Sequence, residues 1–189
     1  MVTSLDQKTA LVLIDLQKGI VNFPLAKPVA GVLKNAGTLA TAFRKAGVPV
    51  VVVNVNPTHS PLNALRKDAK SQPMAFPEEW FEIADEIETT SDDIFITKTI
   101  WNAFTNPALH TELKKREITG IVLAGISTSI GVEGTARAAS EHGYNLTFAQ
   151  DAMADMIASA HEHSINIIFP RIGEVDDTDK IIEKLSSLS

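Results

Sequence analysis

Uninterrupted apolar runs recur along the chain and predict buried strands. The first run covers residues 9–14 and stops at Asp15, with no polar position inside it apart from a leading threonine. Strands that are buried on both faces of a parallel sheet have this continuous pattern, whereas half-exposed strands alternate apolar and polar residues. Comparable runs predict further strands at residues 48–53, 93–97, 118–124 and 146–149, and a short sixth strand at 171–174.

Helical spacing of apolar residues fills the stretches between these runs. In residues 32–46 apolar side chains recur every three or four positions, and Gly47 follows as a helix C-cap. Strands that alternate with helices imply right-handed crossovers and a sheet covered on both faces. We therefore expect a Rossmann-like α/β fold, a three-layer α/β/α domain with a mostly parallel six-stranded sheet, over residues 1–189. The other helices are predicted at residues 107–116, 130–142, 158–169 and 179–188.

Residues 57–77 interrupt this alternation. The segment is rich in proline, serine and asparagine and has no periodic pattern. Surface loops of this length are usually functional or mobile. Arg66 lies in the segment, and its sequence position fits either a contact with a substrate carboxylate or an ordinary surface arginine.

Composition excludes several classes of function. The formal net charge is −6 and the 17 lysines and arginines are scattered, so no nucleic-acid-binding patch is visible. The longest apolar runs are far too short to span a membrane, and no secretory signal is recognised. The chain has no cysteine, which excludes disulfides and thiolate metal sites. We expect a cytoplasmic enzyme or binding protein.

The ends of the predicted strands carry the candidate chemistry. Ligands of open parallel sheets bind outside the carboxyl ends of the strands, and this rule selects Asp15 with Gln17, then Lys98, then the turn at residues 125–131. Taken singly, Asp15 is as readily a cap of a helix or turn, and a lone lysine is usually a surface residue. Their joint placement at strand ends favours a shared site.

Three stretches, taken in order, resemble the isochorismatase-like hydrolase superfamily, which includes nicotinamidases, carbamoyl amidohydrolases and isochorismatases. They are Asp15 with Gln17, the stretch KTIWNAF at 98–104, and the stretch GISTSIGVEGTA at 125–136. The likeness extends over residues 9–174. It implies a six-stranded parallel sheet, a cis peptide before Ser127, and hydrolysis of a small carbonyl or enol-ether substrate.

Gly131 is the main departure from the amidase members of that group. The resemblance implies a nucleophilic cysteine at this position, activated by the residues that match Asp15 and Lys98, and glycine has no side chain to attack with. Ser127, Thr128 and Ser129 offer hydroxyl groups nearby. The stretch is not a Gly-x-Ser-x-Gly elbow, so we expect these hydroxyls to stabilise the turn.

The isochorismatases proper offer another route, because they also have glycine at the matching position. The resemblance implies that Asp15 protonates the enol carbon of a vinyl ether as a general acid, that Lys98 orients it or stabilises charge, and that Gly131 leaves room for the substrate. The charge of Lys98 and the burial of Asp15 have opposite effects on the pKa of Asp15. An ammonium group lowers the pKa of a carboxyl group, whereas an acid needs that pKa raised by burial.

Neither a metal nor a cofactor is expected. Metal-binding amidases of this group carry Asp-x-His after the second strand, and this chain has Asn54-Val55-Asn56 there. Amides are poor ligands for transition metals, so Asn56 is expected to hydrogen-bond a polar group of the substrate instead. His59 is expected to be a solvated loop residue. The segment after the first strand also lacks the glycine-rich dinucleotide fingerprint.

Aromatic residues are expected to wall the pocket. Phe23, Trp101 and Phe104 flank the proposed acid and lysine in sequence, although packing in the core is an equally good interpretation of Phe104. Ile126 and Ser127 are expected to contact the substrate from the glycine-rich turn.

Two interpretations of the whole chain remain open. The first is a cysteine-independent hydrolase of a small molecule, which the joint presence of Asp15 and Lys98 favours. The second is a catalytically inactive relative that binds a metabolite or serves as an oligomeric scaffold, which the missing nucleophile favours. The apolar face of residues 157–169 indicates a homo-oligomer, a dimer or a tetramer as in the resembled group.

Overall fold

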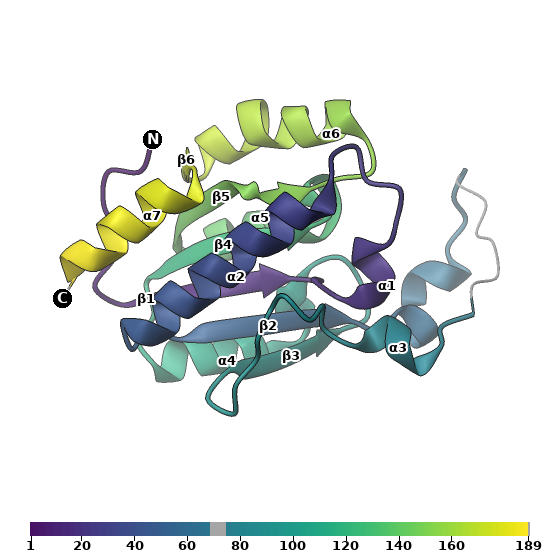
Figure 1. Cartoon of the computed structure of the whole chain (residues 1–189). Coiled ribbons are helices and arrows are strands. Elements are labelled where there is room, and N and C mark those ends of the chain that lie inside the picture. Colours follow the sequence, from purple (N-terminus) through teal and green to yellow (C-terminus); the bar gives the residue numbers. More distant parts are fainter. Residues whose placement is uncertain (69–74, 189) are drawn as a thin grey trace.

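The sheet of the computed structural model has six strands in the order β3-β2-β1-β4-β5-β6, and every neighbouring pair is parallel (Figure 1). The structure describes residues 1–68 and 75–188. The single α/β domain and its parallel six-stranded sheet are confirmed. The strands are β1 Thr9–Ile14, β2 Val50–Val55, β3 Ile94–Lys98, β4 Gly120–Ile126, β5 Asn145–Ala154 and β6 Glu174–Asp176.

Helices cover both faces of this sheet. On one face, α2 and α7 pack over a core that includes Leu39, Phe43 and Ile181. On the other, α4, α5 and the turns after α6 pack over a second core that includes Leu109 and Phe169. The α-helices are α1 Lys18–Val21, α2 Val29–Lys45, α3 Glu78–Phe81, α4 Pro107–Lys115, α5 Glu133–Glu141, α6 Ala158–His163 and α7 Thr178–Leu185.

Several element boundaries differ from the sequence-based expectation. Strand β6 is Glu174–Asp176, because residues before it form the 3₁₀ turn η6, Phe169–Arg171. The helix expected at 130–142 begins with a π-helical turn, η4, Thr128–Val132, before α5. The helix expected at 158–169 likewise passes from α6 into a π-helical turn, η5, Ser164–Ile168. Hydrophobic spacing does not distinguish α from π turns, since both bury one face.

The segment expected to be an aperiodic excursion contains short helical turns. Two 3₁₀ turns are present, η1 Pro57–His59 and η2 Pro61–Ala64, and each is capped by a side chain. Part of the predicted excursion, residues 69–74, lies outside the described residues. Helix α3 follows and packs against α1 at the carboxyl ends of the strands, on the right of Figure 1.

The strand order reverses between β1 and β4, which are neighbours in the centre of the sheet. From β1 the chain continues outward to β2 and β3, and from β4 it continues outward to β5 and β6. The loops that leave β1 and β4 therefore run to opposite sides and open a crevice at their carboxyl ends, where ligands of such sheets bind.

Candidate active site

Asp15 is fixed at the end of the central strand by the sheet itself. All six residues of β1 are buried, and the Asp15 backbone N–H still donates to the Val53 carbonyl of β2 at 2.9 Å. Its backbone turns into the left-handed region with φ of 53°, which aspartate tolerates better than most residues. The strand is buried because it is apolar throughout, and the turn directs the first polar side chain to the sheet edge.

Close approach of two strands at this point requires Gly125. Its φ is 130°, and a Cβ atom placed on it would lie 2.1 Å from the Ile14 carbonyl oxygen. That contact is with backbone of the neighbouring strand, which has no room to move. The end of β4 therefore reaches the end of β1 only because residue 125 has no side chain.

Asp15 and Lys98 form a buried ion pair across three strands. The Lys98 Nζ donates to the Asp15 Oδ2 at 2.6 Å and to the Ile100 carbonyl at 3.0 Å. The two residues are only 5% and 3% exposed. Lys98 ends β3, and β2 lies between β3 and β1, so the two strands are roughly 10 Å apart. Only a long side chain crosses that gap, as that of Lys98 does.

The second carboxylate oxygen of Asp15 is the one unsatisfied side-chain atom buried in the described residues. Asp15 Oδ1 is inaccessible to solvent and has no hydrogen-bond partner. Leaving a buried acceptor unpaired is unfavourable by about 1–3 kcal/mol. Such an atom in a cleft is characteristic of a site that is completed by a ligand or a proton.

Burial raises the pKa of Asp15 to about 6, although the charge of Lys98 and its hydrogen bond pull the pKa back toward the ordinary value. The opposition expected from the sequence is therefore resolved in favour of burial. At neutral pH the carboxylate predominates, and a protonated fraction persists.

The turn after β4 is held by contacts on the side away from the crevice. The Ser129 N–H and hydroxyl both donate to Asp155 Oδ2 at 2.8 Å. The Thr128 hydroxyl donates to the Ala154 carbonyl at 3.0 Å and lies 2.8 Å from His161 Nδ1. The peptide between Ile126 and Ser127 is cis. The hydroxyls of Thr128 and Ser129 thus stabilise the turn and are not among the groups that line the crevice.

Gly131 lies directly beside the carboxylate. A Cβ atom on Gly131 would stand 3.1 Å from Asp15 Oδ2 and 3.0 Å from Ile14 Cγ2. Both distances are shorter than ordinary van der Waals contacts, so any side chain here would press on Asp15. The glycine leaves that space to the crevice.

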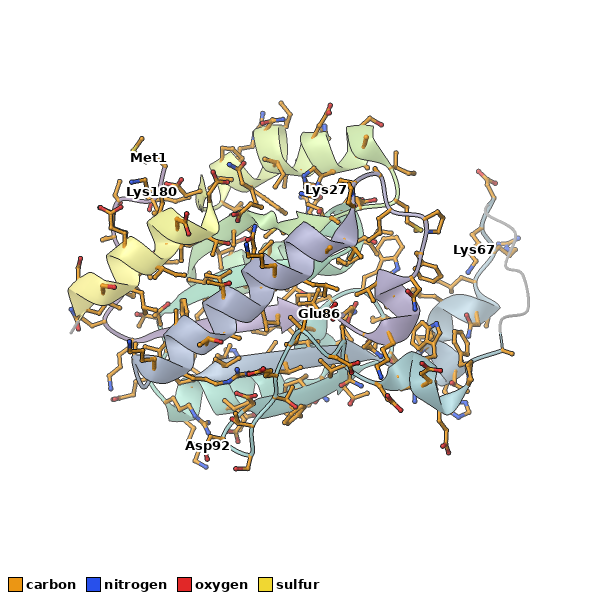
Figure 2. All side chains as sticks on the ribbon, viewed as in Figure 1. Met1, Lys27, Lys67, Glu86, Asp92 and Lys180 are labelled. Carbon is orange, nitrogen blue, oxygen red and sulfur yellow. The ribbon has the colours of Figure 1, made fainter. Side chains whose placement is uncertain are left out.

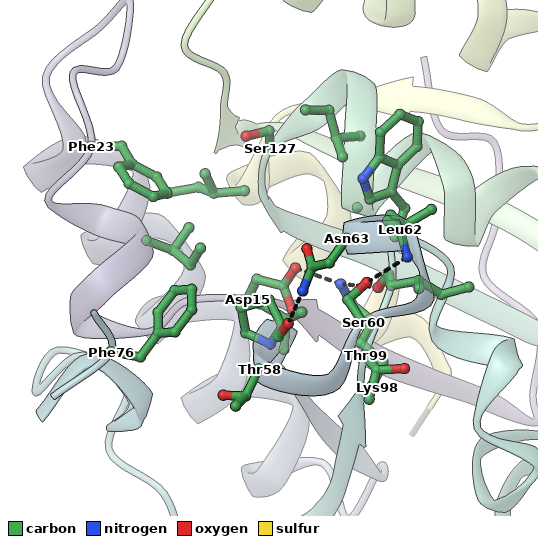
Figure 3. Close-up of a pocket in the computed structure, with 18 of the residues that line it drawn as sticks. Asp15, Phe23, Thr58, Ser60, Leu62, Asn63, Phe76, Lys98, Thr99 and Ser127 are labelled. Atoms are coloured by element: carbon green, nitrogen blue, oxygen red, sulfur yellow. Dashed lines mark hydrogen bonds and ion pairs between the residues drawn. The ribbon is translucent and has the colours of Figure 1, made fainter. Parts of the chain in front are cut away.

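Asp15, Lys98 and Gly131 line one cavity of about 750 Å³ (Figure 3). The volume is in the upper part of the range for small-molecule sites. Among the predicted site residues, the structure brings together Asp15, Phe23, Lys98, Trp101, Ile126, Ser127 and Gly131 as lining. We call the strand-end part of this lining, formed by Asp15, Lys98, Ile126, Ser127 and Gly131, the inner wall.

Three predicted substrate contacts lie outside the cavity lining, and we revise their assignment. Gln17 is fully buried, with Oε1 accepting from the Val55 N–H at 2.6 Å and Nε2 donating to the Val55 carbonyl at 3.2 Å. The Gln17 amide therefore pairs with the Val55 backbone at the end of β2, as the backbone of a neighbouring strand would. Asn56 caps η1 by accepting from the Thr58 N–H. Phe104 packs beside the rings of His142 and Tyr144.

A second wall of the cavity was not foreseen from the sequence. We call it the outer wall, and it consists of Thr58, Ser60, Leu62, Asn63, Lys67, Phe76 and Trp80. Arg66 is exposed and not among the lining residues, whereas its neighbour Lys67 is. The aperiodic pattern marked residues 57–77 as a loop, and the aromatic residues Phe76 and Trp80, at and just beyond the end of that segment, are the signal that could have indicated a covered wall.

Gly19 explains how the outer wall packs against α1. A Cβ atom on Gly19 would lie 2.1 Å from Trp80 Cδ1, so the indole packs flat against the backbone of α1. Phe76 meets Trp80 edge to face with ring centroids 4.9 Å apart. These contacts hold the aromatic part of the outer wall over the crevice.

No trio of histidine, aspartate and glutamate side chains gathers as a metal-ligand cluster in residues 1–68 and 75–188. The Asn54 Oδ1 instead accepts from the Thr97 hydroxyl at 2.9 Å. The expectation of a metal-free site stays a prediction. Within the same residues, no helix has the length and apolarity that crossing a membrane requires.

Known proteins share this architecture. The isochorismatase domain model matches residues 9–180. The isochorismatase family protein YecD of Escherichia coli O157:H7 is 43% identical over 94% of this chain and 96% of its own length. The ureidoacrylate amidohydrolase RutB of Acinetobacter baylyi is 28% identical over 93% of this chain and 83% of its own.

A solved structure adds the same result in three dimensions. The structure of an isochorismatase family protein from Burkholderia thailandensis aligns with a TM-score of 0.92 at 35% identity, covering 98% of this chain and all of the other. Matches of this extent reach every strand of the sheet and both walls of the cavity. The chain therefore belongs to the isochorismatase family of hydrolases.

Proposed function

We propose that the protein hydrolyses a small molecule without a covalent cysteine intermediate, with Asp15 as general acid and base and Lys98 as its electrostatic partner. Hydrolysis of an enol ether is favoured over hydrolysis of an amide. The observation that carries this proposal is the unpaired, buried Oδ1 of Asp15 in a cavity of substrate size.

The two carboxylate oxygens of Asp15 have different surroundings and therefore different proposed roles. Oδ2 is engaged by the Lys98 ammonium at 2.6 Å, whereas Oδ1 has no hydrogen-bond partner, so we assign the transferred proton to Oδ1. Burial raises the pKa of this carboxyl group to about 6. A proton donor works best when its pKa is close to the operating pH.

The proposed reaction begins with transfer of the Asp15 proton to the terminal carbon of the enol ether. The carbon–carbon double bond supplies the electron pair for the new C–H bond, and the ether oxygen stabilises the positive charge left on its carbon. Water then adds to that carbon and returns a proton to Asp15. The resulting hemiketal collapses to a ketone and an alcohol, so the carboxyl group ends in its starting state.

Lys98 balances charge in both halves of this cycle. Its ammonium stabilises the carboxylate that remains after proton transfer, and its hydrogen bond to the Ile100 carbonyl holds it in place. The lysine therefore limits how far burial raises the pKa of Asp15.

Gly131 supports a reaction without an acyl-enzyme. The hydroxyls of Thr128 and Ser129 in the same turn are hydrogen-bonded to Ala154 and Asp155. The same glycine favours a second candidate, a catalytically inactive relative that keeps the cavity to bind a metabolite. In that case a ligand would hydrogen-bond to Asp15 Oδ1 and dissociate without being chemically changed.

The test compares turnover of enol ethers, carbamoyl compounds and simple amides by four proteins: the wild type, Asp15→Asn, Asp93→Asn and Gly131→Cys. Asp93 is a matched control, because it is a buried aspartate in an ion pair with Arg44 at 2.8 Å, remote from the cavity. We expect enol-ether turnover by the wild type and by Asp93→Asn, and a loss of about 100-fold or more in Asp15→Asn.

The outcomes separate the candidates. Turnover that survives Asp15→Asn contradicts the assignment of the acid. Saturable binding of a compound that no protein in the set turns over supports the inactive relative. Amide hydrolysis that appears only in Gly131→Cys indicates a cavity that retains the amidase geometry and lacks its nucleophile.

A homo-oligomer remains a prediction as well. Ile157 and Ile167, which flank α6, are 60% and 43% exposed, and Met156 beside them is 41% exposed. Light scattering coupled to size exclusion measures the mass directly. We expect a dimer or a tetramer for the wild type.

A further inference from the structure

Flat aromatic groups form much of the apolar lining of the cavity. Phe23, Phe76, Trp80 and Trp101 line it, and they come from three separate segments of the chain. Figure 3 shows the rings of Phe23 and Phe76 on the same side of the cavity, at the left of the view. Aromatic faces and edges pack best against flat, unsaturated groups. The lining therefore favours a ligand with a flat body over a saturated or branched one.

Charge in the cavity is asymmetric. Among the described lining residues, the charged ones are Asp15, Lys98 and Lys67. Asp15 and Lys98 compensate each other in their ion pair. The Lys67 Nζ donates to the Leu62 carbonyl at 2.9 Å, and no carboxylate of the described residues forms an ion pair with it. The described part of the lining thus presents one uncompensated positive charge.

The position of that charge gives the ligand a direction. Lys67 follows η2 at the end of the molecule where the outer wall gathers (Figure 2). Its hydrogen bond to the Leu62 carbonyl holds the ammonium against η2, and an ammonium group has three donors, so two remain for a ligand. Asp15 and Lys98 occupy the inner wall, at the strand ends. A ligand that meets both has its anionic group at the outer wall and its reactive group at the inner wall.

We propose that the cavity selects small monocarboxylates with a flat, unsaturated body, and that Lys67 binds the carboxylate. This inference rests on the proposed function for its claim that such a molecule is the substrate, while the binding preference itself needs no turnover. A second carboxylate has no uncompensated cation left among the described lining residues. Dicarboxylates therefore bind more weakly than monocarboxylates of the same shape.

The chain carries its own reporter for this preference. It has two tryptophans, Trp80 and Trp101, and both line the cavity. Intrinsic fluorescence therefore responds to occupancy without a label. The probes are benzoate, the neutral benzyl alcohol, the saturated cyclohexanecarboxylate and the dianion isophthalate, each titrated into the wild-type protein, with calorimetry as an independent measurement.

We expect saturable binding of benzoate and binding at least about threefold to fivefold weaker for each of the other three probes, as one exposed ion pair or one ring contact permits. Lys67→Met weakens benzoate about fivefold and leaves benzyl alcohol unchanged. Lys45→Met is the matched control, because Lys45 ends α2 and does not line the cavity, and it changes neither affinity.

The proposal is overturned if benzoate does not bind saturably, if benzyl alcohol or isophthalate binds as tightly as benzoate, or if Lys67→Met leaves benzoate affinity intact. These results are distinguishable from failure of the proposed function. Selective benzoate binding by a protein that turns over none of the three substrate classes sustains the binding preference and removes the reaction. Turnover of neutral enol ethers, with no preference for an anion, sustains the reaction and removes the binding preference.

Discussion

The two walls of the cavity are built in different ways. The inner wall consists of residues at the ends of β1, β3 and β4, which are tied into the sheet, and of residues in the turn after β4, and its ion pair is almost completely buried. The outer wall consists of two 3₁₀ turns, Lys67, Phe76 and a single turn of helix, α3, and much of it is exposed. In the proposed function, the reaction chemistry therefore lies on the wall that is tied into the sheet, and the proposed ligand-selecting contacts lie on the more exposed wall.

The difference has an energetic side. A substitution at Gly125, directly before the inner-wall residue Ile126, meets neighbouring backbone, because a Cβ atom there would lie 2.1 Å from the Ile14 carbonyl oxygen. Substitutions that affect the outer wall meet side chains, as the contact between Gly19 and Trp80 shows. A side chain can change rotamer at a small energetic penalty, whereas the backbone of a paired strand cannot shift without disrupting packing. Disturbing the first wall is expected to affect folding, and disturbing the second to affect binding.

Gly125→Ala has the largest expected effect. The new methyl group would stand 2.1 Å from the Ile14 carbonyl oxygen, at a φ of 130° that alanine rarely adopts. We expect a loss of more than about 3 kcal/mol in the free energy of unfolding, measured by urea denaturation. Gly31→Ala is the control, because Gly31 lies in α2 with open space around it, and it should stabilise by about 0.5–1 kcal/mol. Equal stability of the two variants would contradict the rigidity of the inner wall.

Lys98→Met tests the ion pair itself. Lys98 lowers the pKa of Asp15 by its charge and its hydrogen bond, so removal of the lysine raises that pKa above about 6. An acid is active while protonated, and the kcat of the wild type should therefore fall as pH rises above about 6. The falling limb should move to higher pH in the variant, with a maximal kcat reduced by about tenfold or more. Lys180→Met, in an exposed ion pair with Glu183, should leave the profile unchanged. An unmoved limb in Lys98→Met would show that another group titrates.

Gly19→Ala has the smallest expected effect. Its methyl group displaces the Trp80 indole, which changes the tryptophan emission spectrum and weakens benzoate about threefold to tenfold. The free energy of unfolding should fall by no more than about 1–2 kcal/mol. Gly134→Ala is the control near the other tryptophan, since its Cβ would meet Trp101 Cβ at an ordinary 3.5 Å. A large loss of stability in Gly19→Ala would mean that the outer wall is as rigid as the inner one.

The same comparison explains what the sequence could predict. Continuous apolar runs identified the strands, and the rule that ligands bind at their carboxyl ends then selected Asp15 and Lys98, which lie 83 positions apart in the chain. Strand order is not encoded in those runs. The sequence therefore could not show that the Lys98 side chain extends past β2 to Asp15. Nor could it show that the Gln17 amide is hydrogen-bonded to the backbone of Val55 at the end of β2.

The outer wall escaped prediction for a physical reason. Its residues have no period, because short 3₁₀ turns capped by Asn56 and Ser60 bury no regular face. The contact between Gly19 and Trp80 joins residues that share no local pattern. Lys67 resembles any surface lysine until the cavity is seen beside it.

Proton transfer from Asp15 to carbon is the central claim, and hydrolysis of an enol ether in D₂O tests it most directly. The mass spectrum of the ketone product is the measurement. We predict one carbon-bound deuterium in the product formed by the wild type at the earliest times, and no enzymatic product above background from Asp15→Asn. The claim would be contradicted if the carbon that was the terminal alkene carbon of the enol ether carried no deuterium in the product, or if hydrolysis proceeded equally well in Asp15→Asn.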